Sequence, residues 1–120
     1  MDNFKTKYAS DIQSKQQAFA IMLAHFLIQI DEMGYQVTLG DAYRDPRVHG
    51  RQGEKASYSA GSSAHKWRMA IDLNLFKAGQ LLTRSEDYEL IGTVWEKMGG
   101  SWGGRFSDGN HFSLMHNGIR

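Results

Sequence analysis

The chain contains no cysteine. This absence excludes disulfide-stapled scaffolds, thiolate zinc fingers and cysteine nucleophiles. Any metal ion that the protein binds must therefore be held by His, Asp or Glu side chains. Because a chain without cysteine tolerates either redox setting, the absence does not indicate a compartment.

The sequence also lacks a concentrated charge of either sign. Its formal net charge is +1, with 14 Lys and Arg against 13 Asp and Glu, and the basic residues are scattered. Nucleic-acid-binding domains usually carry a basic face, so this function class has little support and we expect no nucleic-acid partner. With 120 residues, of which 41% are apolar, the chain predicts a single globular domain over 1–120. Nothing in the sequence indicates more than a monomer.

No apolar run is long enough to cross a bilayer. The longest, over 18–30, is interrupted by His25 and Gln29. The first residues carry no basic segment followed by an apolar run, which is the mark of a secretory signal. We therefore expect a soluble protein made in a cytoplasm, without a signal peptide and without a membrane partner. If its substrate lies outside the cell, another component must deliver it.

The spacing of apolar residues predicts two helices. The first begins near Ser10 or Asp11, either of which can cap a helix, and ends at Gly34. The second is expected over 85–98 with Ser85 as its cap. Its predicted apolar stripe consists of Tyr88, Leu90, Ile91, Val94, Trp95 and Met98.

Strict alternation of apolar and polar residues predicts strands over 35–39, 69–75 and 111–115. A long loop over 45–63, rich in Gly and Ser, joins the first two strands and is typical of functional or disordered segments. The order of these elements predicts an α+β domain, in which two helices cover one face of a small, mainly antiparallel sheet. The opposite face would carry Arg44, Asp72 and His111.

Three side chains are candidates for a shared metal ion on that open face. Asp72 projects from the strand over 69–75 beside the small Ala70, and His111 comes from a neighbouring strand. His65 cannot share one face of a straight strand with Asp72, because they are seven residues apart and the side-chain period is two. The two converge if His65 lies in the turn that enters the strand. Two imidazoles and one carboxylate leave a fourth position open for water, as in catalytic zinc sites.

Two further residues lie close to these candidates in the sequence. Asp108, three residues before His111, can fold back over the metal as a general base, although its Asp-Gly pair is first of all a turn former. Trp67 lies between two candidate ligands and can form a wall of the pocket. The same residue types occur in many proteins without a metal. Spacing alone therefore leaves open that these residues have only structural roles.

The pattern Ser63-x-His65-x-x-x-x-Ala70-x-Asp72, followed by Asp108-x-x-His111, resembles the signature of a zinc peptidase family. This is the D-alanyl-D-alanine carboxypeptidase and endolysin family, which includes phage L-alanyl-D-glutamate endopeptidases and the VanX/VanY type of bacterial enzymes. The resemblance runs from about Ala42 to Leu114. It implies a hedgehog/DD-peptidase-like fold, with His65, Asp72 and His111 as ligands of Zn2+ and Asp108 as the catalytic acid/base.

The resemblance also implies roles for two further positions. Arg44 would bind the scissile carbonyl or stabilise the oxyanion, and Ser63 would contact substrate. One departure matters, because Arg68 stands where the family has glycine. If that position needs a positive φ, Arg68 implies a shifted turn or backbone strain.

The function that the resemblance implies is a zinc metallopeptidase acting on the peptide stem of peptidoglycan. A compact bacteriophage endolysin that cuts between L-Ala and D-Glu, and so degrades the cell wall, is the first interpretation. A D-Ala-D-Ala carboxypeptidase is the second. A non-catalytic, zinc-containing cell-wall-binding module remains a third, which the Arg68 departure keeps open.

Overall fold

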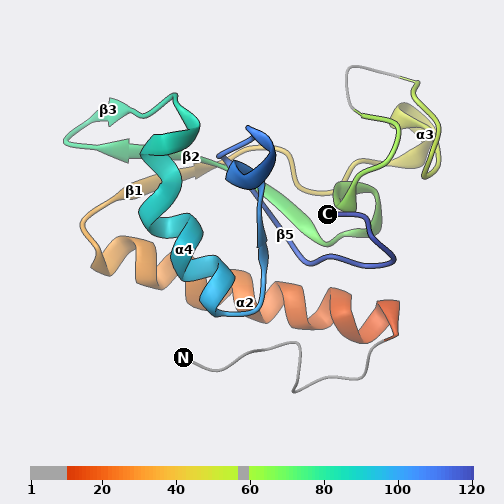
Figure 1. Cartoon of the computed structure of the whole chain (residues 1–120), viewed down its shortest axis with the longest axis horizontal. Helices are drawn as coiled ribbons and strands as arrows, with labels where there is room; N and C mark the ends of the chain where they lie inside the picture. Colours follow the sequence, from red (N-terminus) through yellow and green to blue (C-terminus); the bar gives the residue numbers. More distant parts are fainter. Residues whose placement is uncertain (1–10, 57–59) are drawn as a thin grey trace.

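The computed structural model describes residues 11–56 and 60–120. Its strands are β1 (Gln36–Leu39), β2 (Ala70–Lys77), β3 (Gln80–Leu81), β4 (Ser101–Trp102) and β5 (His111–Ser113). Its α-helices are α2 (Ile12–Glu32), α3 (Pro46–His49) and α4 (Glu89–Lys97). Three short 3-10 helices are η1 (Ala64–Trp67), η2 (Ser85–Tyr88) and η3 (Gly103–Phe106). Figure 1 shows the small open sheet with α2 running along it, so the predicted α+β class is confirmed.

The sheet is antiparallel and is organised around β2. The strand order is β1-β2-β5-β4, and β3 pairs with β2 after a tight turn. In the pairing of β2 with β5, Asp72 lies opposite His111 and Ile71 lies opposite Phe112. Because side chains alternate between the two faces of a strand, this register puts Asp72 and His111 together on one face.

Both long helices cover the other face of the sheet, as predicted. The Phe26 ring from α2 lies 4.9 Å from the Trp95 ring of α4 and 5.1 Å from the Phe112 ring of β5, measured between centroids. All three side chains are completely buried. Burial of such large aromatic groups dominates the energetics of a small core, so this cluster fixes β5 against the helices.

The first helix follows its prediction closely, whereas the second does not. Asp11 caps α2 by accepting a hydrogen bond from the Ser14 amide. Ser85, however, does not cap an α-helix, because one turn of 3-10 helix (η2) precedes α4 and the Ser85 hydroxyl accepts a hydrogen bond from Gly109 instead. Leu90, placed in the buried stripe, is 64% exposed. Leu90 is the exception in this stripe, because Tyr88, Ile91, Trp95 and Met98 are buried as predicted.

Two short strands and one short helix were not predicted. Both β3 and β4 have two residues each, too few to show an alternating pattern. The long loop contains α3, whose first residue is Pro46 and whose cap is Asp45. None of the helices within 11–56 and 60–120 combines the length and the apolarity that crossing a membrane requires.

Arg68 adopts the left-handed conformation that the missing glycine suggested. Its φ is 58° and its ψ is 33°, directly after η1. A side chain in this region is strained because its Cβ approaches the backbone. The Arg68 guanidinium stacks 3.9 Å from the centroid of the Tyr43 ring, and this contact offsets part of the strain.

Substitutions of Arg68 separate these two effects. Arg68→Gly removes both the strain and the stacking, whereas Arg68→Ala removes only the stacking. We expect the free energy of unfolding of Arg68→Gly to exceed that of Arg68→Ala by about 1 kcal/mol. Urea denaturation of the two proteins measures the difference, and equal stabilities would show that the left-handed turn carries no strain.

Candidate metal centre

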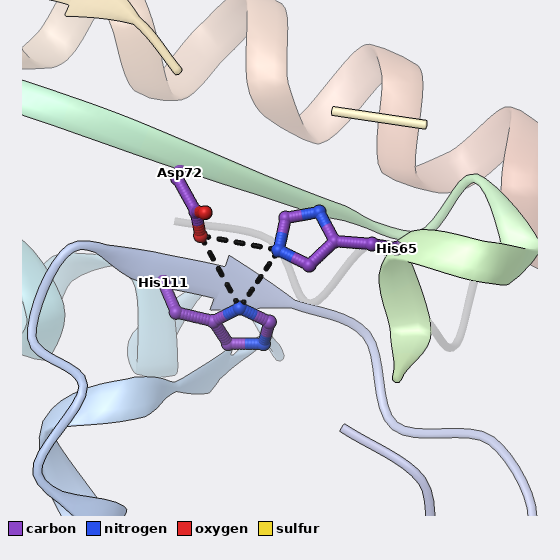
Figure 2. A group of neighbouring side chains, drawn as sticks. All are labelled: His65, Asp72 and His111. Carbon is purple, nitrogen blue, oxygen red and sulfur yellow. Dashed lines mark hydrogen bonds and ion pairs between the residues drawn. The ribbon is translucent and has the colours of Figure 1, made fainter. Parts of the chain in front are cut away.

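Three donor atoms meet at the open face of the sheet. The Nε2 atom of His65 lies 3.1 Å from Oδ1 of Asp72 and 3.1 Å from Nδ1 of His111. The third side of the triangle, from His111 Nδ1 to Asp72 Oδ1, is 3.4 Å. Figure 2 shows the three side chains converging from η1, β2 and β5. The structure therefore brings together all three residues predicted as metal ligands.

Asp72 and His111 are placed by the strand register. The Asp72 amide donates to the Asp41 carbonyl at 2.8 Å, and the Asp72 carbonyl accepts from the Gly40 amide at 2.7 Å. Both polar groups of the Asp72 backbone thus point away from β5. Toward β5, Asp72 occupies a non-hydrogen-bonded position, where facing side chains of antiparallel strands come closest.

His65 is placed by the turn of η1, as predicted. The Ser63 hydroxyl accepts a hydrogen bond from the His65 amide and so caps this turn. The His65 ring is 1% exposed, and its Nδ1 lies 2.7 Å from the carbonyl oxygen of Ala42. Since a carbonyl only accepts, Nδ1 carries the proton and the lone pair of Nε2 faces the cluster. A hydrogen bond of this kind orients histidine ligands in metal sites.

The His111 ring is held differently. Its Nδ1 faces the cluster, while its Nε2 is buried without a hydrogen-bond partner among the described residues. The ring of Phe106 packs edge-on against it, with 5.7 Å between centroids. Packing, and not an outer hydrogen bond, therefore orients this second imidazole.

The Asp72 carboxylate is kept ionised. Burial by itself raises the pKa of Asp72. When the His111 and His65 rings are protonated, the hydrogen bonds that they donate and the charge that they carry outweigh it. The net effect holds the pKa of Asp72 well below its usual range. The site therefore offers a negative charge and two imidazole nitrogens to a common point.

The donor set fits a divalent metal ion such as zinc. Bonds of about 2.0–2.1 Å at tetrahedral angles put donor atoms roughly 3.3 Å apart, and the observed separations are 3.1–3.4 Å. Two electron-pair donors and a carboxylate at such distances repel one another unless a cation lies between them. Three protein ligands leave one coordination position for water or substrate.

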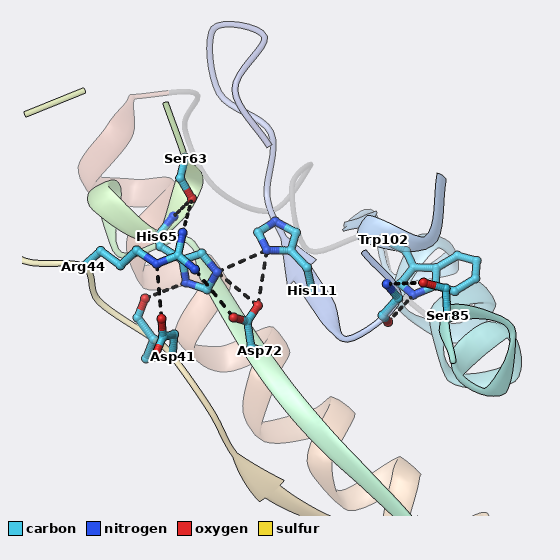
Figure 3. Close-up of polar contacts among 10 residues, drawn as sticks. Asp41, Arg44, Ser63, His65, Asp72, Ser85, Trp102 and His111 are labelled. Atoms are coloured by element: carbon cyan, nitrogen blue, oxygen red, sulfur yellow. Dashed lines mark hydrogen bonds and ion pairs between the residues drawn. The ribbon is translucent and has the colours of Figure 1, made fainter. Parts of the chain in front are cut away.

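Arg44 and Ser63 lie beside the metal ligands, as the resemblance implied. Arg44 donates from Nε to Asp41 at 3.3 Å and from Nη1 to the Ser63 hydroxyl at 3.5 Å, and its Nη2 lies 3.7 Å from Asp72 Oδ2. Figure 3 shows this network next to the His65–Asp72–His111 cluster. The Arg44 side chain is 14% exposed, so it is a partly buried bridge and not a surface ion pair.

A cavity of about 490 Å³ opens over this site. Its lining includes the two residues just discussed, one metal ligand and the predicted acid/base: Arg44, Ala60, Ser62, Ser63, Phe106, Asp108, His111, Gly118, Ile119 and Arg120. Trp67 is not part of this lining. Its ring packs against that of His116, with 5.3 Å between centroids, so the structure does not bring it to the cavity and its contact with substrate stays a prediction.

Asp108 is exposed and is carried by a rigid turn. The Asp108 amide donates to the Gly103 carbonyl at 2.8 Å. The next residue, Gly109, is fixed on both sides, by the Ser85 hydroxyl at its amide and by the Trp102 indole at its carbonyl (Figure 3). Asp108 therefore lies in the expected turn and also lines the cavity.

Sequence reasoning missed several parts of the site. The Ala42 carbonyl is a backbone group and leaves no signature in residue types. Asp41, which pairs with Arg44, stands three residues before it, but that spacing occurs widely. The residues over 118–120 reach the cavity only through the path of the chain after β5, which no local pattern indicates.

Metal binding tests the assignment of the ligands. We expect the protein to bind one zinc ion, and His111→Ala to weaken binding by more than about 100-fold, because even outer partners of a ligand are worth about 10–100-fold. His25→Ala, in α2 on the other side of the sheet, is the matched control and should bind as the unsubstituted protein does. Isothermal titration calorimetry measures both, and equal affinities would remove His111 from the site.

Comparison with known proteins agrees with this site. Residues 57–114 match the sequence profile of the D-alanyl-D-alanine carboxypeptidase family. The match covers just under half of the chain and includes Ser63, the three metal-site residues and Asp108, whereas Arg44 lies outside it. No curated protein matches the chain significantly. Together, the match and the His-Asp-His cluster support an assignment to the D-alanyl-D-alanine carboxypeptidase family and to its peptidoglycan-acting metallopeptidases.

Proposed function

We propose that this chain is a zinc metallopeptidase that hydrolyses peptide bonds in the peptidoglycan stem, acting on the cell wall as a monomeric phage endolysin. The observation that carries the proposal is the cluster of His65, Asp72 and His111, with His111 lining a cavity that Asp108 also lines. Two imidazoles, one carboxylate and an open position are the ligand set of catalytic zinc sites. The family match supports the peptidase chemistry.

The residues around the cavity have complementary roles in this reaction. A zinc ion bound there supplies a Lewis acid that polarises the scissile carbonyl and acidifies water. Asp108 accepts the proton from the attacking water and returns it to the leaving amine. Arg44, held by Asp41 and Asp72, presents positive charge where the carbonyl oxygen becomes negative. Ser63 keeps the Arg44 guanidinium and η1 in register.

The arrangement of cavities favours cleavage within a peptide. Asp108 also lines a second cavity, of about 310 Å³, together with Asn74, Ser85 and Tyr88. Two separate cavities therefore share Asp108 as a lining residue. An endopeptidase must hold peptide on both sides of the bond that it cuts, so we propose the bond between L-Ala and D-Glu as the first choice.

A D-Ala-D-Ala carboxypeptidase is the second candidate, and the description of the matched family favours it. Such an enzyme removes the terminal residue. Its site needs to hold only one residue on the leaving side of the bond that it cuts. The two activities release different products from the same wall, which makes them separable in one digestion.

Digestion of purified peptidoglycan by the zinc-loaded protein tests the function. We expect new N-terminal D-Glu in the mass spectrum of the products, lost with a chelator and restored by zinc. Asp108→Asn should lower the rate by about 100-fold or more, the usual contribution of general acid-base catalysis, while zinc affinity is unchanged. Asp31→Asn, a matched change on the exposed end of α2, should digest normally.

Other outcomes discriminate among the alternatives. Release of terminal D-Ala alone would assign the carboxypeptidase activity. Absence of any product from several wall types, in protein that holds one zinc ion, would contradict the peptidase and favour a wall-binding module.

A further inference from the structure

Lys66 is a buried cation that the proposed chemistry does not use. Its side chain follows His65 in η1, and the residue is only 4% exposed. Four backbone carbonyl oxygens surround Nζ, at 2.6 Å (Glu54), 2.6 Å (Gly61), 3.0 Å (Arg51) and 3.1 Å (His49). An ammonium group has three N–H donors and no acceptor, so the oxygens converge on a positive charge as much as on individual donors.

The four carbonyls belong to the stretch from His49, the last residue of α3, to Gly61, and its described residues, 49–56 and 60–61, lie around the ammonium. The Gly61 carbonyl also accepts a hydrogen bond from the Gly53 amide at 3.0 Å. Likewise, the His49 carbonyl accepts one from the Ala56 amide at 3.3 Å. Lys66 therefore joins points that are distant along the segment and ties them to the turn that carries His65.

The same segment holds the wall of the cavity. The Gln52 side chain brackets Ser63, donating from Nε2 to its carbonyl at 2.5 Å and accepting at Oε1 from its amide at 2.8 Å. Ser63, with Ala60 and Ser62, lines the cavity over the metal centre. The position of this wall thus depends on a segment whose own shape depends on Lys66.

We propose that Lys66 is a positioning residue, which fixes the cavity wall over 60–63 so that it can bind the substrate of the proposed peptidase. A neutral side chain removes the positive charge on which the four oxygens converge, and it removes the donor of the Glu54 carbonyl. Polar groups that lose such a partner favour opening toward water. The segment is then no longer held by Lys66, and the cavity wall over 60–63 loses its fixed position. The effect on substrate binding rests on the proposed function. The effect of Lys66 on the shape of the segment does not.

The metal centre is expected to tolerate this change. His65 and Lys66 are adjacent in η1, but the His65 ring is held by the Ala42 carbonyl and by the other ligands. None of these contacts involves the segment around the ammonium. Neutralising Lys66 should therefore alter substrate binding more than metal binding, which a general loss of structure would not do.

The test compares Lys66→Met with Lys55→Met, the same change at an exposed position of the same segment. Zinc-loaded proteins are digested briefly with trypsin, and cleavage after Arg51 is followed by mass spectrometry. The KM and kcat for soluble stem peptides and the zinc affinity are measured in parallel. For Lys66→Met, we expect cleavage after Arg51 and KM to rise about tenfold or more, with zinc affinity near its original value. Lys55→Met should behave as the unsubstituted protein.

Chemical rescue makes the charge itself the variable. Because the chain has no cysteine, Lys66→Cys can be alkylated at one position in the unfolded state and then refolded. An aminoethyl group, which restores an ammonium at nearly the original distance, should restore trypsin resistance and KM, whereas a neutral propyl group should not.

Several results would overturn the proposal. Unchanged trypsin resistance and KM in Lys66→Met would show that the contacts of Lys66 with the four carbonyls are dispensable. A loss of zinc affinity as large as the change in KM would show a general structural role. If Lys66→Met does not fold, Gln52→Ala decides, because an unchanged KM in that variant would show that the wall needs no support. A chain that hydrolyses no stem peptide in any form defeats the proposed function, while the trypsin comparison still decides whether Lys66 holds the segment.

Discussion

The pairing of β2 with β5 is the constraint on which the rest of the site depends. It places Asp72 opposite His111, in the non-hydrogen-bonded position where side chains approach most closely. A slip of β5 by one residue would turn His111 into the core, away from Asp72, and would turn Phe112 toward solvent. The aromatic cluster of Phe26, Trp95 and Phe112 makes such a slip costly. The hydrophobic core on one face of the sheet therefore holds the metal ligands on the other.

A single turn, η1, positions both the third ligand, His65, and the cavity wall next to the paired strands β2 and β5. Within η1, His65 points to the metal centre and Lys66 points into the segment before it, while Ser63 caps the turn. Arg68 ends the turn in a left-handed conformation that glycine would adopt without strain. Stacking on Tyr43 explains why arginine is tolerated there. Arginine in place of glycine therefore adds backbone strain at this turn but leaves the three ligands in place.

The sequence predicted the site better than it predicted the segments around it. His65, Asp72 and His111 were found because strand alternation and donor chemistry are local signals, and the family pattern added Arg44, Ser63 and Asp108. The structure brings all six to one region. The predicted start of α4 was wrong because the turn that begins at Ser85 forms a 3-10 helix. The four-carbonyl cage of Lys66 was missed because backbone groups leave no trace in residue types. Trp67 is not among the residues that line the cavity, and its ring packs against His116.

The central claim is that these strands and this turn together hold a catalytic metal with one open position. X-ray absorption at the zinc edge of the loaded full chain tests it most directly. The account predicts two imidazole ligands and two oxygen ligands at about 2.0–2.2 Å, with one oxygen replaced when a small thiol or hydroxamate is added. A site with fewer than two imidazoles, or a closed site that no added ligand enters, would contradict it.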